Sequence, residues 1–117
     1  MSRYVILEHD HPVLHWDFML ESGGALRTWR LESPPRPDEA VSGTASFDHR
    51  LHYLDYEGPV SGDRGCVKRW DFGEFTWLAD QGGQVTVNLV GKRLRGIARL
   101  LKGTEGRWLV TFDPQMS

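Results

Sequence analysis

Hydrophobic and polar residues alternate with a period of two along most of the chain, which is typical of β-strands rather than helices. The clearest case is segment 14–20, where apolar and polar side chains alternate strictly. A Gly-rich turn at 21–24 separates this segment from a second alternating stretch at 25–31. The pattern therefore predicts an antiparallel hairpin near the start of the chain.

The remaining residues continue this pattern in short segments. Further strands are predicted at 4–8, 43–49, 52–57, 66–71, 74–79, 84–90, 92–101 and 107–112. Three prolines make 32–40 an irregular connection, and Gly96 favours a strand over a basic helix in its segment. About eight short strands with tight turns and little helix predict an all-β fold, an antiparallel barrel or sandwich. Closure into a small barrel would remove the exposed edges.

Composition indicates one globular domain spanning residues 1–117, with 39% hydrophobic and 26% charged residues. Cys66 is the only cysteine, which excludes an internal disulfide and a thiolate metal cluster and fits a reducing compartment. The first ten residues mix charged and apolar side chains, and no apolar run reaches membrane length. We therefore expect a cytoplasmic protein without a membrane partner.

Charge is unevenly distributed around a net value of −2. Residues 1–58 hold five arginines, ten acidic residues and all five histidines, whereas residues 59–117 hold nine basic and six acidic residues. Imidazoles and acids on one side and cations on the other would suit a metal site beside a polyanion groove. A solvated surface with no ligand explains the same asymmetry.

The first cluster with candidate chemistry lies in segment 9–17. If 14–20 is a strand, His15 and Asp17 share one face with Cα atoms about 6.6 Å apart, close enough for both to bind one ion. His9 lies just past the preceding strand and could supply a third ligand. Two imidazoles and one carboxylate suit Mn, Fe or Zn and leave positions open for water or substrate. A hydrogen-bonded His–Asp surface pair is the alternative, and His11 is assigned to a turn without chemistry.

A second cluster lies at residues 48–53. His49 could act as a general acid or base, or donate to a phosphate oxygen, with Tyr53 nearby. Solvent-exposed imidazoles at the end of a polar strand are the alternative.

Several segments together resemble one family. Segment 8–21, EHDHPVLHWDFMLE, resembles the pattern His-Asp-x4-Leu-His-aromatic-Asp-Phe-x-Leu-Glu that opens the 3'-phosphoesterase module of bacterial DNA ligase D and its free-standing relatives. The similarity continues through LRTW, DHRLHYLDYEG, WD, LVGKRLRG and WLV at 26–29, 48–58, 70–71, 89–96 and 108–110.

The resemblance implies a compact β-barrel that removes a 3'-terminal ribonucleoside or a 3'-phosphate from nucleic acid in a manganese-dependent reaction, preparing ends for DNA repair by end joining. The metal ligands would be His9, His15 and Asp17. His49 would be the imidazole on the phosphate side, with Tyr53 beside it. The implied partners are a nucleic-acid 3' end and a DNA ligase or other end-joining proteins.

The chain departs from the family pattern at three cationic positions. Two family arginines fall on Met19 and near Val41, and a family lysine falls near Ser33. Loss of these cations would cost several kcal/mol of transition-state stabilisation unless they are replaced. Candidate replacements are Arg27, Arg50 and Arg64. Further basic residues of the second half are expected to follow the nucleic-acid backbone, namely Lys68, Lys92, Arg93 and Arg95.

Two other functions are compatible with the sequence. Met19 and Val41 favour a module of the same fold that keeps the metal and binds DNA ends without turnover. A nonhaem iron oxygenase is the other, because His15 and Asp17 with a distal His49 or His52 also form two imidazoles and one carboxylate. The chain is short for the usual jelly-roll elaborations of that class.

Overall fold

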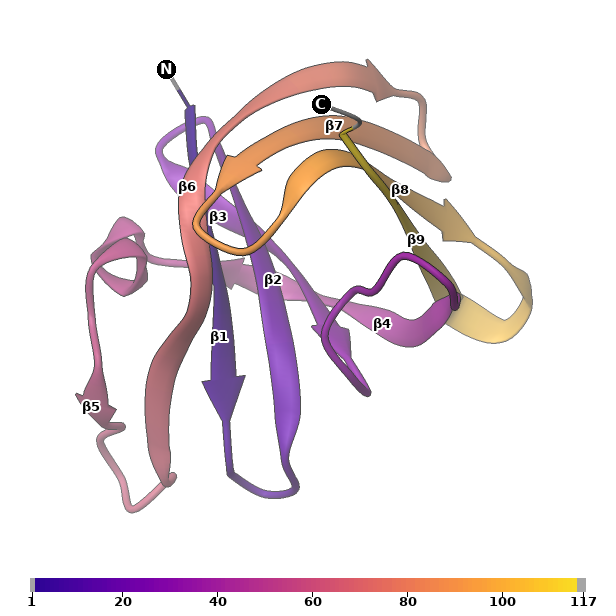
Figure 1. Ribbon diagram of the computed structural model, residues 1–117. Helices are drawn as coiled ribbons and strands as arrows, with labels where there is room; N and C mark the ends of the chain where they lie inside the picture. Colours follow the sequence, from indigo (N-terminus) through magenta and orange to yellow (C-terminus); the bar gives the residue numbers. More distant parts are fainter. Residues whose placement is uncertain (1, 116–117) are drawn as a thin grey trace.

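The strands of the computed structural model, which describes residues 2–115, form one antiparallel sheet (Figure 1). Its elements are β1 (Ser2–His9), β2 (His15–Ser22), β3 (Ala25–Leu31), β4 (Val41–His49), β5 (Gly58–Pro59), β6 (Cys66–Asp80), β7 (Gln84–Gly91), β8 (Arg95–Lys102) and β9 (Arg107–Pro114). Two short 3-10 turns complete them, η1 (Leu51–Leu54) and η2 (Thr104–Gly106). No helix in this part of the chain has the length and hydropathy for a membrane crossing.

The sheet closes on itself into the predicted β-barrel. Its strand order is β1-β2-β3-β4-β9-β8-β7-β6, and an additional pairing between β1 and β6 joins the ends. β5 is an extra strand outside the closed barrel that pairs with the start of β6. Closure satisfies the edge hydrogen bonds of β1 and β6, which an open sheet would expose.

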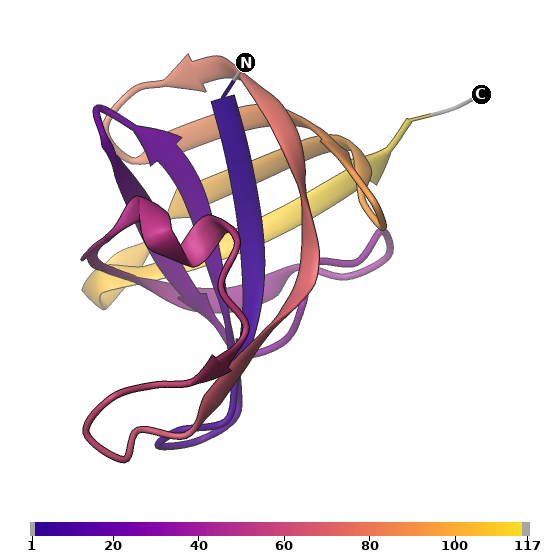
Figure 2. The ribbon, with the colours of Figure 1, turned by 90° about the vertical axis from the view of Figure 1, so that its left-hand side faces the viewer.

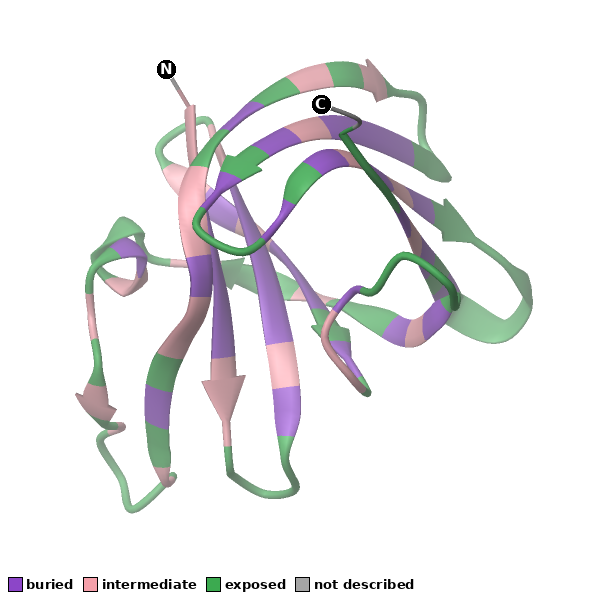
Figure 3. Cartoon of the chain, viewed as in Figure 1, coloured by how far each residue is buried: buried purple, intermediate pink, exposed green. Residues whose placement is uncertain are grey.

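The period-two alternation places one set of side chains inside the barrel. Tyr4 and Ile6 of β1 and Phe18 and Leu20 of β2 face each other there, and all four are buried. Trp29 and Trp108 pack edge to face across this core with ring centroids 5.6 Å apart. The purple bands that recur along the strands in Figure 3 mark such buried positions.

A second, smaller core lies outside the barrel wall. The outward side chains of Val5, Leu7 and Met19 are buried against Leu54 of η1 and Val67 of β6. Figure 2 shows η1 lying against the outer face of the barrel beside β1 and β2. This covering layer explains why β1 is apolar on both faces instead of alternating.

Three predicted strand assignments are corrected by the structure. Segment 52–57 is not a strand: the turn η1 occupies its first half, where Leu54 is buried and Tyr53 is partly buried against the same outer core. Segments 66–71 and 74–79 form the single strand β6, which continues through Gly73. A Cβ at Gly73 would lie 2.2 Å from the carbonyl oxygen of Val90, so this close approach requires glycine.

The structure also corrects the start of two segments. Leu14 precedes β2 and is 54% exposed, so it does not join the apolar face of that strand. Residues 92–94 turn before β8 begins at Arg95. The buried carboxylate of Asp71 accepts the backbone N–H groups of Arg93 and Leu94 at 2.8 and 3.1 Å. These bonds replace the ladder bonds that a strand would make there.

Candidate metal and phosphate site

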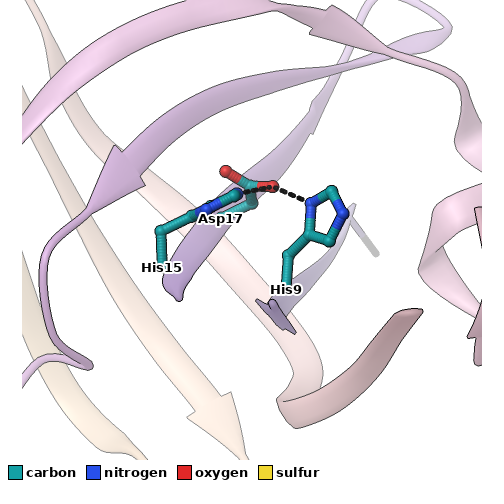
Figure 4. Close-up of side chains that lie close together, drawn as sticks. All are labelled: His9, His15 and Asp17. Atoms are coloured by element: carbon teal, nitrogen blue, oxygen red, sulfur yellow. Dashed lines mark ion pairs between the residues drawn. The ribbon is translucent and has the colours of Figure 1, made fainter. Parts of the chain in front are cut away.

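His9, His15 and Asp17 meet on the outer face of the barrel (Figure 4). His9 ends β1 and lies directly opposite His15, the first residue of β2, while Asp17 is two residues further on the same face. Asp17 Oδ2 is 3.3 Å from His15 Nε2 and 3.9 Å from His9 Nδ1. One ligand atom from each residue lies within 4.8 Å of the others. The antiparallel register thus brings together the three residues that the sequence selected.

Hydrogen bonds orient both imidazoles. His15 Nδ1 lies 2.8 Å from the carbonyl oxygen of Val13, and His9 Nε2 lies 2.8 Å from that of Arg64. A carbonyl only accepts, so each of these nitrogens carries the proton. The lone pairs of His15 Nε2 and His9 Nδ1 therefore point toward Asp17. This arrangement, with the second ring N–H donated to a carbonyl, is the usual one for metal-binding histidines.

Burial indicates that this group fits a cation. His15 and Asp17 are only 2% and 4% exposed, and neither His15 Nε2 nor Asp17 Oδ1 has a hydrogen-bond partner among the described residues. Buried polar atoms without partners are costly, and a divalent ion would satisfy them. Because His15 and Asp17 are buried, the alternative of a surface His–Asp pair does not describe them.

A pocket of about 490 Å³ opens beside the three residues. One wall is formed by β1 and β2, and the facing wall by the end of β4 and the segment that follows it. The lining residues with polar or aromatic side chains are His9, His11, Asp17, Arg30, Phe47, Asp48, His49, Arg50, Tyr53 and Arg64. Both predicted clusters therefore lie on one pocket.

His49 is held at the pocket wall by its Nδ1 atom. This atom lies 3.0 Å from the carbonyl oxygen of Phe47 and 3.0 Å from Thr28 Oγ1. The Thr28 hydroxyl itself donates to the Leu26 carbonyl oxygen, so His49 Nδ1 carries the proton and Nε2 keeps its lone pair. The ring stacks on Phe47 and meets Tyr53 edge to face at 5.8 Å.

The environment of His49 favours the neutral imidazole. Burial lowers its pKa, and the nearby guanidinium of Arg30 lowers it further, against the opposing carboxylates of Asp17 and Asp48. The imidazole is therefore uncharged at neutral pH while the pocket holds no anion.

The three arginines predicted to bind phosphate are placed differently. Arg50 and Arg64 line the pocket. Arg27 points to the opposite face of β3, where it pairs with Asp80 at 2.9 Å and lies over the rings of Trp29 and Trp77. The structure does not bring Arg27 to the other site residues.

The other expected cations and ligands are also placed by the structure. Lys68, Lys92, Arg93 and Arg95 do not line this pocket. Met19 and Val41 are buried apolar side chains, the first beside the pocket and the second in the barrel core. Neither His49 nor His52 joins the ligand group, whose third member is His9.

Sequence reasoning missed Arg30 and Phe47, and it assigned no role to His11, which also lines the pocket. Arg30 lies directly opposite Asp17 in the β2–β3 ladder. The Gly23–Gly24 turn determines this pairing, because Ser22 and Ala25 face each other on either side of it. Carrying that register back along the hairpin would have placed Arg30 beside Asp17, one of the predicted metal ligands.

Comparison with known proteins gives one consistent result. The family model "DNA Ligase D 3'-phosphoesterase domain" matches residues 7–102. The multifunctional non-homologous end joining protein LigD of Pseudomonas aeruginosa is 34% identical over 94% of this chain, and the LigD protein of Mycobacterium tuberculosis is 34% identical over 92%. The chain spans about 15% of the length of these relatives.

Proposed function

The chain belongs to the DNA ligase D 3'-phosphoesterase domain family, and from this membership we propose that it is a metal-dependent phosphoesterase acting on nucleic-acid 3' ends. The reaction would remove a 3'-terminal ribonucleoside or a 3'-phosphate. The observation that carries the proposal is the group of His9, His15 and Asp17, with partnerless buried atoms, facing His49 across one pocket.

Three residues would hold the metal. His15 Nε2, His9 Nδ1 and an Asp17 oxygen are the donors, a set that suits manganese and leaves positions for water and a phosphate oxygen. The bound ion would supply Lewis-acid polarisation of the scissile phosphate and lower the pKa of a bound water or substrate hydroxyl.

His49 would accept and then donate a proton on the phosphate side of the site. Its Nε2 lone pair takes up a proton when a phosphate anion enters, because the negative charge raises the imidazole pKa toward neutrality. The protonated ring then donates to a nonbridging or leaving oxygen. Tyr53 packs against this ring and Arg50 lies over Tyr53, so both support its orientation.

The names of the relatives indicate the proposed setting. They are named for non-homologous end joining, so we place the activity in DNA repair, where damaged 3' ends are prepared for sealing. A DNA ligase or another end-joining protein is the proposed partner.

A second candidate function is binding of DNA ends without turnover. Met19 favours it, because this buried side chain beside the pocket is apolar where the resemblance places a phosphate-binding arginine. Fewer cations at the phosphate reduce transition-state stabilisation more than they reduce ground-state binding.

The test uses two DNA primers, one ending in a single 3' ribonucleotide and one in a 3'-phosphate. We expect the wild type with Mn²⁺ to shorten or dephosphorylate these ends and EDTA to stop it. Asp17→Asn should reduce the rate at least about 100-fold, as expected when a metal ligand is lost. Asp38→Asn, an exposed carboxylate outside the pocket, is the matched control.

The outcomes separate the two candidates. Binding that prefers the 3'-phosphate end but shows no product with Mn²⁺ would support the end-binding module. Absence of both product and preference for the modified ends would overturn both proposals. Equal activity of wild type and Asp17→Asn would overturn the metal site.

A further inference from the structure

We propose that Arg30 is the cation that binds the substrate phosphate in this chain. The inference rests on the proposed function and adds a substrate-binding residue to it. Arg30 is distinguished by its position on β3 opposite the metal ligand Asp17 and by a guanidinium group that the rest of the protein leaves available.

The first argument is the availability of its guanidinium group. Arg64 Nε donates to the Ser61 carbonyl oxygen at 2.7 Å, and its Nη2 lies 3.3 Å from Ser61 Oγ. Arg50 also makes no side-chain hydrogen bond among the described residues, but it lies over the Tyr53 ring, 5.9 Å from its centroid, whereas Arg30 lies beside Asp17. The Arg30 side chain makes no hydrogen bond within residues 2–115, although it lines the pocket and is 45% exposed. Its five N–H donors are thus free for a ligand.

The second argument is the position of this side chain between the two halves of the site. Arg30 Nε is 3.9 Å from Asp17 Oδ1, beyond hydrogen-bond distance but close enough for attraction. Its positive charge also acts on His49 across the pocket. A phosphate that touched both the metal and the His49 imidazole would therefore lie within reach of Arg30.

The third argument is the charge of the neighbouring residues on the same face. The next pair of the β2–β3 ladder on this face is Met19 and Thr28, and both are buried and uncharged. A divalent ion and Asp17 together leave one positive charge, whereas a phosphomonoester carries about two negative charges at pH 7. Arg30 supplies the missing charge, and its planar fork matches two phosphate oxygens.

The experiment measures the affinity for a short DNA strand with either a 3'-phosphate or a 3'-hydroxyl end. Binding is followed by fluorescence anisotropy in the presence of Mn²⁺, with readings taken before turnover occurs. We expect wild type to prefer the 3'-phosphate. Arg30→Ala should reduce this preference about 10- to 100-fold, the loss typical of a charge-assisted hydrogen-bond pair. Arg30→Lys keeps the charge without the fork and should lose less.

The controls distinguish phosphate binding from folding and from metal binding. Arg99→Ala removes a strand arginine of similar exposure on β8, outside the pocket, and should keep the preference. Thermal melting tests whether each variant is folded. Mn²⁺ affinity by electron paramagnetic resonance should be unchanged or tighter in Arg30→Ala, because a positive charge beside Asp17 has been removed.

Each outcome has a distinct meaning. A folded Arg30→Ala variant with the wild-type preference for the 3'-phosphate would overturn the role of Arg30 and leave the proposed function intact. A wild type that binds both ends equally would also overturn the role of Arg30, whereas the proposed function is tested separately by product formation with Mn²⁺. Loss of Mn²⁺ binding in Arg30→Ala would show that the residue acts on the metal instead of the phosphate.

Discussion

At the scale of single residues, His49 makes the stability of the folded protein depend on pH. Its pKa is lowered by burial, whereas in the unfolded chain it returns to about 6.5. The unfolded state therefore binds the proton more readily. The contribution of His49 to the free energy of unfolding is complete above about pH 6.5 and falls as the pH drops toward the folded-state pKa.

We therefore expect the free energy of unfolding to depend less on pH in the His49→Gln variant than in wild type. Urea unfolding of the metal-free protein between pH 5 and pH 8 would measure it, with the difference between wild type and variant isolating His49 from the other histidines. The difference should shrink as the pH falls below 6.5. A constant difference across this range would contradict the assignment.

Residues also show how far the site could be predicted. Alternation alone selected His15 and Asp17, because neighbours two apart in a strand share a face. Placing His9, His49 and Tyr53 needed the fold, since these residues reach the pocket from β1, β4 and η1. The distribution of charge along the chain was a poor guide to the cations of the pocket. The second half of the chain holds most of the basic residues, yet Arg30 and Arg50 of the pocket come from the acidic first half.

At the scale of elements, the barrel strands followed from sequence wherever one face was buried and one exposed. The prediction failed where a tertiary contact decided the backbone. η1 forms because Leu54 packs on the outer face of β1, and the 92–94 turn forms because Asp71 accepts two backbone N–H groups there. Neither contact is local in sequence, so no periodicity could reveal it.

The Asp71 contact gives a prediction for β1 and β6. Tyr4 donates its hydroxyl to Asp71 Oδ2 at 2.6 Å, and both residues are only 1% exposed. Tyr4→Phe removes a hydrogen bond to a buried carboxylate and should lower the free energy of unfolding by about 1.5–3 kcal/mol. Urea denaturation would measure the loss. A variant as stable as wild type would show that the carboxylate finds another donor.

Arg27 gives a second prediction at this scale. Its pairing with Asp80 joins β3 to β6, and its guanidinium covers the indoles of Trp29 and Trp77. Arg27→Ala should destabilise the protein by about 1 kcal/mol through lost packing and cation–π contact. Thermal melting with Arg36→Ala as the exposed control would test this. Equal melting temperatures for both variants would contradict it.

At the scale of the whole molecule, metal binding and folding are linked. The proposed ligands come from two strands and are properly arranged only in the folded barrel, so Mn²⁺ should bind the native state preferentially. At about 100 times its dissociation constant the ion would add about 2.7 kcal/mol of stability. For a chain of this size that raises the melting temperature by about 10 °C. Differential scanning fluorimetry would show the rise in wild type and not in Asp17→Asn.

The hydrogen bond from His9 to the Arg64 carbonyl joins the proposed metal ligands to the loop at residues 61–65. Gly65 adopts a φ of +75°, and a Cβ there would lie 2.2 Å from Asp10 Oδ1, so the loop is fitted closely against the β1–β2 connection. Ion binding and loop order are then thermodynamically coupled. If the ion stabilises the ordered loop, the ordered loop raises the affinity for the ion by the same free energy. Mn²⁺ should slow amide hydrogen exchange across 61–65, and Gly65→Ala should weaken Mn²⁺ binding without altering any ligand. A segment that touches no metal would in this way set how tightly the metal is held.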